Sequence, residues 1–559
     1  MKRSGASLTR PPIVLALVVV VLCQGPLVAQ FAERVEVTVA NVDVVVTDAH
    51  GNPVRGLTKD DFELFESGKK QAITNFTAID VAPHAAPAEN PSGADDVAKI
   101  PARQPRLIIL FVDIGEIEPS RRVKFFDAVR SFLDSAFREG DVVAVLAWNH
   151  RVRVVLPPTS DRRTLDTVID VLGAPFGSKE SAIAERLAEM HVEQAEHDAA
   201  LSLQLGLGGL GDAKAERDFQ EFITGEERCA AIKRKARELR NMLVSFSRVE
   251  LQKVLVFASD DLSLGPSSRL DPREYRPPTC YTTSDLDLLA DAANAYGITI
   301  HAFHPPGARD SVKGPDRGGV LPSANDPAPL ASGYLRAFDE EGGLLLLARR
   351  TGGLSGAGPA VSAKLLERAA RELDIYYSLG YRVTSPGDDK ARSIKVTTRN
   401  RNHRIRVRDS VVHLSNDSRI SDLVTTNLYL PLDGEMKGPA FSVRVGEGKR
   451  DGRFVIVPVE VLFDARALAL LPSTKDKSKG AVSLFVTSGR ELGDASDVTE
   501  IKKEFEIATP AADAPSNVLY SFAVRVRPDT RRLSVALRDD VSGDVGTRVV
   551  ALEGSNATR

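Results

Sequence analysis

The sequence predicts a multidomain protein that combines an α/β domain with regions built only from β-strands. Its 559 residues exceed what one hydrophobic core normally organises, so several domains are expected. Between residues 106 and 385, apolar strand patterns alternate with amphipathic helix patterns, which is typical of a parallel sheet with helices on both faces. The segments 30–81 and 427–555 carry strand patterns separated by turn residues, which predicts β domains on either side.

The N-terminus has the pattern of a secretory signal peptide. Basic residues precede the apolar run 13–23, which is short for a bilayer span, and the small Ala29 suits the position before a cleavage site. We expect residues 1–29 to be removed, so that the mature chain begins at Gln30. An uncleaved membrane anchor and lipidation at Cys23 remain open as alternatives. Export would place the protein in the periplasm, in the cell envelope or outside the cell, and membrane contact is expected only if the segment is kept.

A small β domain is predicted for residues 30–81, with a hairpin centred on Ser67 and Gly68. Residues 82–105 are rich in Ala and Pro and lack periodicity, which predicts a linker.

The α/β domain is expected to begin with "RLIILFVD", an apolar run suited to a strand buried on both faces. Pro119 then opens a helix whose apolar residues share one face. A charged helical insertion is expected at 179–248, and "IYYSLGYRV", residues 375–383, reads as the last strand of this domain.

Beyond residue 385 the helix patterns stop. We predict a β extension of the α/β domain at 386–412, a polar linker at 413–426 and a β-sandwich at 427–555. The formal net charge of −3 argues against a nucleic-acid partner held by a broad basic surface.

The order of these pieces resembles a known family. "RLIILFVDIGEI", "GDVVAVLAW", "KVLVFASDD" and "GITIHAF" resemble a von Willebrand factor type A domain. With "GNPVRGLTKDDFELFESGKKQAITNF" before them and "LARRTGG" and "IYYSLGYRV" behind, the set resembles secreted VWFA-related proteins of the Acidobacteria type over roughly residues 31–410. The resemblance implies a Rossmann-like sheet used for binding protein partners.

Many type A domains bind a divalent cation through Asp-x-Ser-x-Ser after the first strand, a Thr on a later loop and an Asp after the fourth strand. Asp113 matches the first Asp, but Gly115 and Ile117 replace both serines. Asp260 matches the later Asp, and Ser178 or its neighbour Ser181 could replace the Thr. Because two oxygen ligands are missing, we expect a degenerate site, with magnesium or manganese binding as the alternative.

Other motifs give no support for an enzyme. The run "GLGGLG" at 206–211 fits a dinucleotide fingerprint in form, but no strand precedes it. The pairs His301 with His304 and His191 with His197 have spacings that separate their side chains, so we expect no zinc site and no cofactor.

Two cysteines remain after export, Cys229 and Cys280. Because each precedes or follows the strand 253–259 on the same side of a parallel sheet, a disulfide between them is predicted, with two free thiols as the alternative.

These observations predict a secreted or envelope-associated binding protein that is not an enzyme. Its partner is expected to be a protein that contacts the upper rim of the type A-like domain, near residues 114–120, 173–182 and 260–282. A structural envelope scaffold is the alternative, and a hydrolase with an unrecognised site is a more distant one.

Overall fold

The computed structural model describes residues 39–80, 105–173, 227–259, 262, 282–304, 342–430 and 438–552, with short gaps inside these ranges. The predicted signal peptide, residues 82–104 of the predicted linker and residues 179–226 of the predicted insertion lie outside the described residues. In the described part, no helix is both long enough and apolar enough to cross a membrane.

The central domain contains a six-stranded sheet in the order β10-β9-β8-β5-β6-β7. All neighbours pair in parallel except the edge strand β7, which is antiparallel to β6. The strands are β5 (Arg106–Asp113), β6 (Val142–Trp148), β7 (Val152–Thr159), β8 (Gln252–Ala258), β9 (Ile298–Phe303) and β10 (Ser355–Gly356). The predicted α/β class is therefore confirmed, with the strand order of a doubly wound fold.

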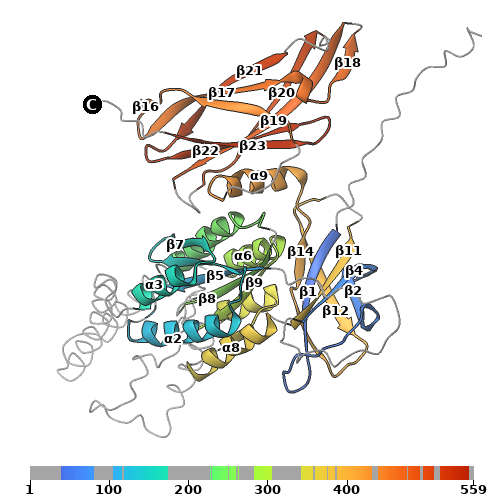
Figure 1. The fold of residues 1–559 in the computed structure, drawn as a ribbon, viewed down its shortest axis with the longest axis vertical. Helices are drawn as coiled ribbons and strands as arrows, with labels where there is room; N and C mark the ends of the chain where they lie inside the picture. The colour runs from blue at the N-terminus through green and yellow to red at the C-terminus, as the bar shows by residue number, and fades with distance from the viewer. Residues whose placement is uncertain are drawn as a thin grey trace, which may run out of the picture.

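Helices cover both faces of this sheet (Figure 1). One face packs against α6 (Thr283–Ala295) and the helical residues 229–244 and 342–351. The other packs against α2 (Pro119–Ala136), α3 (Arg162–Gly173) and α8 (Pro359–Glu372). Every residue of β5 is buried, as its continuous apolar pattern predicts.

The segments before and after the central domain form one β-sandwich. Its first sheet has the order β13-β1-β11-β4 and its second the order β14-β12-β2-β3. A shared core of apolar side chains, including Val44, Leu64 and Leu379, joins the two sheets. The strands are β1 (Val39–Thr47), β2 (Phe62–Glu66), β3 (Lys69–Gln71), β4 (Ile73–Asp80), β11 (Ile375–Arg382), β12 (Ala391–Thr398), β13 (Arg404–Val407) and β14 (Ser410–Val412).

This arrangement corrects two predictions. Strand β11 is not the last strand of the central sheet, because it pairs antiparallel with β1 and β4. The residues predicted as a β extension at 386–412 complete the same sandwich instead of lengthening the α/β domain. An apolar run indicates a strand but not its partners, so these pairings could not be read from the pattern. The predicted hairpin is present, with positive φ angles at Ser67 and Gly68.

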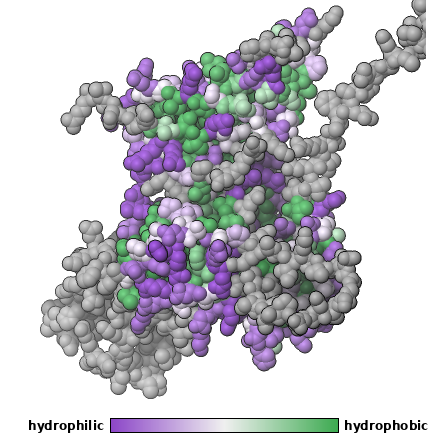
Figure 2. All heavy atoms as spheres, viewed as in Figure 1, coloured by the Kyte–Doolittle hydropathy of each residue, from purple (hydrophilic) through white to green (hydrophobic). Residues whose placement is uncertain are grey.

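The C-terminal strands form two further sheets that share one core. Strands β15, β16 and β21 pair with β17 in one sheet, and β18, β19, β20, β22 and β23 form the other. The bounds are β15 (Phe441–Val445), β16 (Lys449–Asp451), β17 (Phe454–Asp464), β18 (Leu471–Thr474), β19 (Lys477–Gly489), β20 (Thr499–Ala508), β21 (Asn517–Val526), β22 (Arg532–Asp539) and β23 (Val545–Ala551). Figure 2 shows hydrophobic residues at the surface over this part of the chain, above a more hydrophilic α/β domain.

The predicted linker at 413–426 is largely a helix, α9 (Asn416–Asn427). Ser415 caps it by accepting a hydrogen bond from the backbone N–H of Ser418 at 3.2 Å. The buried Ile420 and Val424, four residues apart, pack against the C-terminal core residue Phe485. The prediction was wrong because most residues of this segment are polar, so the helical spacing of its few apolar residues was not recognised.

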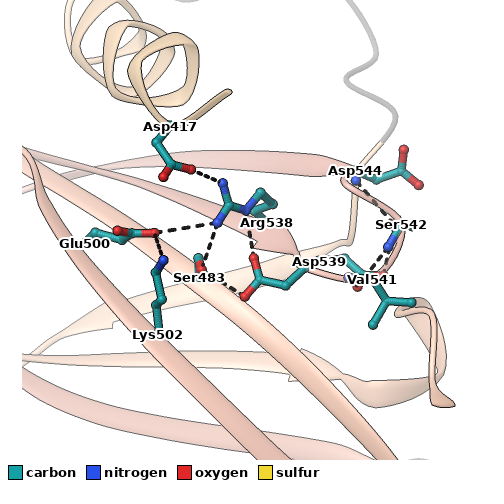
Figure 3. A network of polar contacts seen from close by, with 10 residues as sticks. Asp417, Ser483, Glu500, Lys502, Arg538, Asp539, Val541, Ser542 and Asp544 are labelled. Carbon is teal, nitrogen blue, oxygen red and sulfur yellow. Dashed lines mark hydrogen bonds and ion pairs between the residues drawn. The ribbon is translucent and has the colours of Figure 1, made fainter. Parts of the chain in front are cut away.

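Helix α9 connects the C-terminal sandwich to the central domain. Arg538 of β22 forms an ion pair with Asp417 of α9 and also contacts Ser483 and Glu500 on neighbouring strands (Figure 3). At its other end, the Thr426 hydroxyl donates to the carbonyl oxygen of Val244 in the central domain at 3.0 Å. The helix therefore contacts both domains through specific polar groups.

Candidate functional site

The sequence places Asp113 at the carboxyl end of the first central strand, and the structure confirms this position. Asp113 is the last residue of β5 and is fully buried. The chain then turns toward α2: the N–H of Gly115 donates to the carbonyl of Trp148 at 3.1 Å, and the N–H of Ile117 donates to that of Asp113 at 3.0 Å. This is the edge of the sheet where doubly wound folds bind ligands.

The carboxylate of Asp113 lies against the ammonium group of Lys235. The two side chains form an ion pair, with 0% of Asp113 and 2% of Lys235 exposed. The Ser259 hydroxyl donates to the same carboxylate oxygen at 2.7 Å, and Lys235 Nζ lies 3.4 Å from that hydroxyl. Lys235 Nζ also lies 5.7 Å from the ring centre of Trp148. A side chain of the protein therefore supplies the positive charge beside Asp113.

A second cation supports the turn that follows Asp113. Arg122 is buried, and its guanidinium donates to the carbonyl oxygens of Ile117 at 3.0 Å and Ile114 at 2.5 Å. Burial lowers the pKa of Arg122, while the nearby charge of Asp113 opposes this shift. Arg122 thus fixes the loop that a metal-binding domain would use to present its hydroxyl ligands.

The two positions that should carry serines have different surroundings. Ile117 is 1% exposed and belongs to the core under α2, so its side chain contributes to packing. A Cβ atom at Gly115 would find its nearest atoms in Asn149 and Trp148 at 3.6–3.7 Å, which is ordinary contact. A side chain would therefore fit at 115, and the missing hydroxyl there is not explained by crowding.

The other predicted ligands, Asp260 and Ser178, lie outside the described residues. Among the residues that the structure does describe, no group of three or more His, Cys, Asp or Glu side chains could hold a metal ion. The structure brings Asp113 together with Ser259 and Lys235, neither of which the sequence predicted for this site.

A signal for Lys235 was present in the sequence. The helix that carries it buries Cys229, Ile232, Ala236 and Leu239, which follow the spacing of one helix face. Lys235 falls on that apolar face, where an unpaired charge would be costly. Such a lysine implies a buried acidic partner, although the pattern does not say which one.

Cys229 is disulfide-bonded and 2% exposed. Its predicted partner, Cys280, lies outside the described residues, so that pairing remains a prediction.

The buried His301 has a structural role, because its Nδ1 accepts the backbone N–H of Leu354 at 3.1 Å. Burial lowers the pKa of His301 to about 3, so the ring is neutral. His304 is also buried, while His191, His197 and the glycine run 206–211 lie outside the described residues.

The central sheet has six strands in doubly wound order with one antiparallel edge strand, and Asp113 ends its first strand. This is the Rossmann-like arrangement that the sequence resemblance implies. The central domain has a Rossmann-like fold of the kind that von Willebrand factor type A domains share.

Several solved structures are similar to this chain at low sequence identity. The chain is similar to an aerotolerance-related membrane protein from Bacteroides fragilis, with 12% identity over 48% of this chain and 99% of that chain, at a TM-score of 0.23. It is similar to the vWF domain of the type V pili tip protein Mfa5 from Porphyromonas gingivalis, with 12% identity over 48% and 95% of the two chains, at a TM-score of 0.23.

A third similar structure is the manganese-loaded TRAP protein of Plasmodium vivax, with 8% identity over 55% of this chain and 94% of that chain, at a TM-score of 0.23. No protein-family model and no curated protein matches the chain. At these identities and TM-scores, the type A assignment depends on the strand order and helix layers of the chain itself.

Proposed function

We propose that the protein is a secreted or envelope-associated binding protein whose type A domain contacts a protein partner at its rim without a bound metal ion. The buried ion pair between Lys235 and Asp113 carries this proposal. In a metal-dependent type A domain, the matching carboxylate would help to hold the cation. Here an ammonium group already neutralises it, so a divalent cation would have to displace a buried lysine.

The rim beside this pair offers exposed polar groups to a partner. The turn between β6 and β7 contains Asn149, His150 and Arg151, of which His150 and Arg151 are exposed. It adjoins the Asp113 turn through the hydrogen bond from Gly115 to Trp148. His150 has a positive φ of 59°, a conformation that is uncommon outside glycine. Charged rim groups of this kind contribute to partner selection and to the association rate.

Capture of partners from an envelope extract tests the proposal. The purified mature chain is immobilised, and proteins retained in magnesium are compared with those retained in EDTA by mass spectrometry. We expect the same discrete partner in both buffers. The variant Arg151→Glu should lose it, whereas Lys124→Glu, which reverses an exposed charge on α2, should keep it. Retention that requires magnesium would contradict a metal-independent rim.

A scaffold role without a specific ligand is the second proposal, and the contacts of α9 with both neighbouring domains favour it. It predicts no discrete partner in either buffer and equal behaviour of the two charge-reversal variants.

We further propose that the protein is not an enzyme. A hydrolase screen with ester, peptide and glycoside substrates would contradict this if activity purified with the chain.

A further inference from the structure

A cavity of about 890 Å³ is lined by residues of the first sandwich, the central domain and helix α9. Its wall on the central domain includes Arg106 and Gln252, the first residues of β5 and β8. Asp113 is at the other end of β5, roughly 23 Å away for seven residues of strand. The cavity is therefore separate from the rim site, and its volume is in the range of small-molecule sites at domain interfaces.

One wall of the cavity is the outer face of the sheet β1-β11-β4. Asp43, Ser378 and Thr77 lie on these three strands as direct cross-strand neighbours, and all three line the cavity. Other lining residues come from the end of α6 and the turn after it, including Asn294 and Gly297.

Arg408 is a buried charged residue that lines this cavity. It is 8% exposed, and its Nη1 donates to the carbonyl oxygen of Asn294 at 3.0 Å. No other hydrogen bond and no ion pair joins its guanidinium to the part of the chain that the structure describes. Burial lowers the pKa of Arg408, and the charge of Asp43 only partly opposes this effect. A guanidinium has five N–H donors, and within the described residues Arg408 uses only one of them.

A second arginine that lines the cavity, Arg106, is paired with a carboxylate. Arg106 is 2% exposed and forms an ion pair with Asp141 at 2.6 Å, supported by further bonds between the two side chains. Arg408 is nearly as buried but has no carboxylate within ion-pair distance among the described residues. Its bond to Asn294 explains its place at the end of α6, where a cation is favoured. That bond involves one N–H group and gives no partner, among the described residues, to the other N–H groups of Arg408.

The lining has an excess of positive charge. Its cations are Arg106, Arg248, Lys253, Arg408 and Arg419, and its carboxyl groups are Asp43 and Asp422. Because Asp141 neutralises Arg106 from outside the lining, the other three arginines remain beside two carboxyl groups. Arg248 is exposed and Arg419 is half-buried, so both can meet a charged molecule that enters. The charge favours an anion, and the buried guanidinium favours one with paired oxygens.

We propose that this cavity binds a small organic molecule with a carboxylate or phosphate group, which pairs with Arg408. Arg248 and Arg419 attract the anion and contact its outer part. The wall of Asp43, Ser378 and Thr77 offers hydroxyl and carboxyl groups to the remainder of the molecule. The proposal is independent of the rim function, because the two sites are at opposite ends of β5.

Titration calorimetry on the full mature chain at low salt tests this, with citrate and inorganic phosphate as anionic probes and glucose as the neutral control. Low salt is required because counterions screen exposed arginines. We expect saturable binding of at least one anion and none of glucose. Arg408→Gln should weaken binding roughly tenfold or more, because a charge-assisted pair is lost. Arg444→Gln, at an exposed arginine of the C-terminal sandwich, should leave it unchanged.

A second variant keeps the test decisive if Arg408→Gln does not fold. Ser378→Trp retains Arg408 and places a large ring on the cavity wall, so it should also abolish binding while circular dichroism stays unchanged. Citrate binding separates a carboxylate ligand from a phosphate ligand. Absence of saturable binding by both anions would overturn the proposal. Equal affinity in Arg408→Gln and Arg444→Gln would also overturn it, since the anion would then bind the surface only adventitiously.

Discussion

The substitution Lys235→Met tests the assignment of the buried ion pair directly. Methionine keeps most of the length and apolar surface of lysine but removes the charge, so Asp113 would be left buried without its cation. Removing one partner of a buried pair typically costs about 3–5 kcal/mol. With 0% of Asp113 and 2% of Lys235 exposed, the effect should fall in that range, not near the value of a surface pair.

The fluorescence of Trp148 provides the assay. Trp148 is the single tryptophan of the chain, and its ring centre is 5.7 Å from Lys235 Nζ. Urea unfolding followed by this signal therefore reports on the central domain. Arg237→Met, at an exposed position of the same helix, should change the free energy of unfolding by less than about 0.5 kcal/mol.

A double substitution separates the ion pair from general damage. In Asp113→Asn with Lys235→Met, no charge is left unpaired, so the double variant should be more stable than the sum of the single losses predicts. A coupling of roughly 2 kcal/mol or more would indicate a direct interaction. A loss below about 1 kcal/mol for Lys235→Met, or strictly additive losses, would refute the reasoning.

Three further outcomes are expected. Magnesium and manganese should not raise the melting temperature, because Lys235 already neutralises Asp113; a saturable rise that disappears in Asp113→Ala would contradict this. Burial raises the pKa of Asp422 to about 7, so stability should fall by up to about 4 kcal/mol as the pH rises from about 4 to 7, and urea titrations of Asp422→Asn should lack this fall. Thiol titration of the denatured, unreduced mature chain should detect no free thiol, and two free thiols would exclude the predicted disulfide between Cys229 and Cys280.

The sequence predicted what depends on local patterns. The buried strand β5, the helix opened by Pro119 and the hairpin at Ser67 follow from periodicity and turn residues, and Asp113 follows from its place at the end of β5. The partners of β11 did not follow, because its contacts with β1 join residues more than 300 positions apart, as in the pair Val42 and Leu379. Lys235 was missed for a similar reason: its partner lies 122 positions away.

The two ends of β5 differ in how their charges are satisfied, and this difference decides which end can accept a charged ligand. At the carboxyl end, Asp113 and Lys235 neutralise each other inside the protein. An ion added there would meet a carboxylate that already has a cation beside it. At the amino end, Arg106 is neutralised by Asp141, but Arg408, which also lines the cavity, makes one guanidinium hydrogen bond within the described residues. A buried charge without a partner costs folding free energy, and a ligand that supplies the partner recovers part of it. We therefore expect anion binding at the cavity and, at the rim, contacts that need no metal ion.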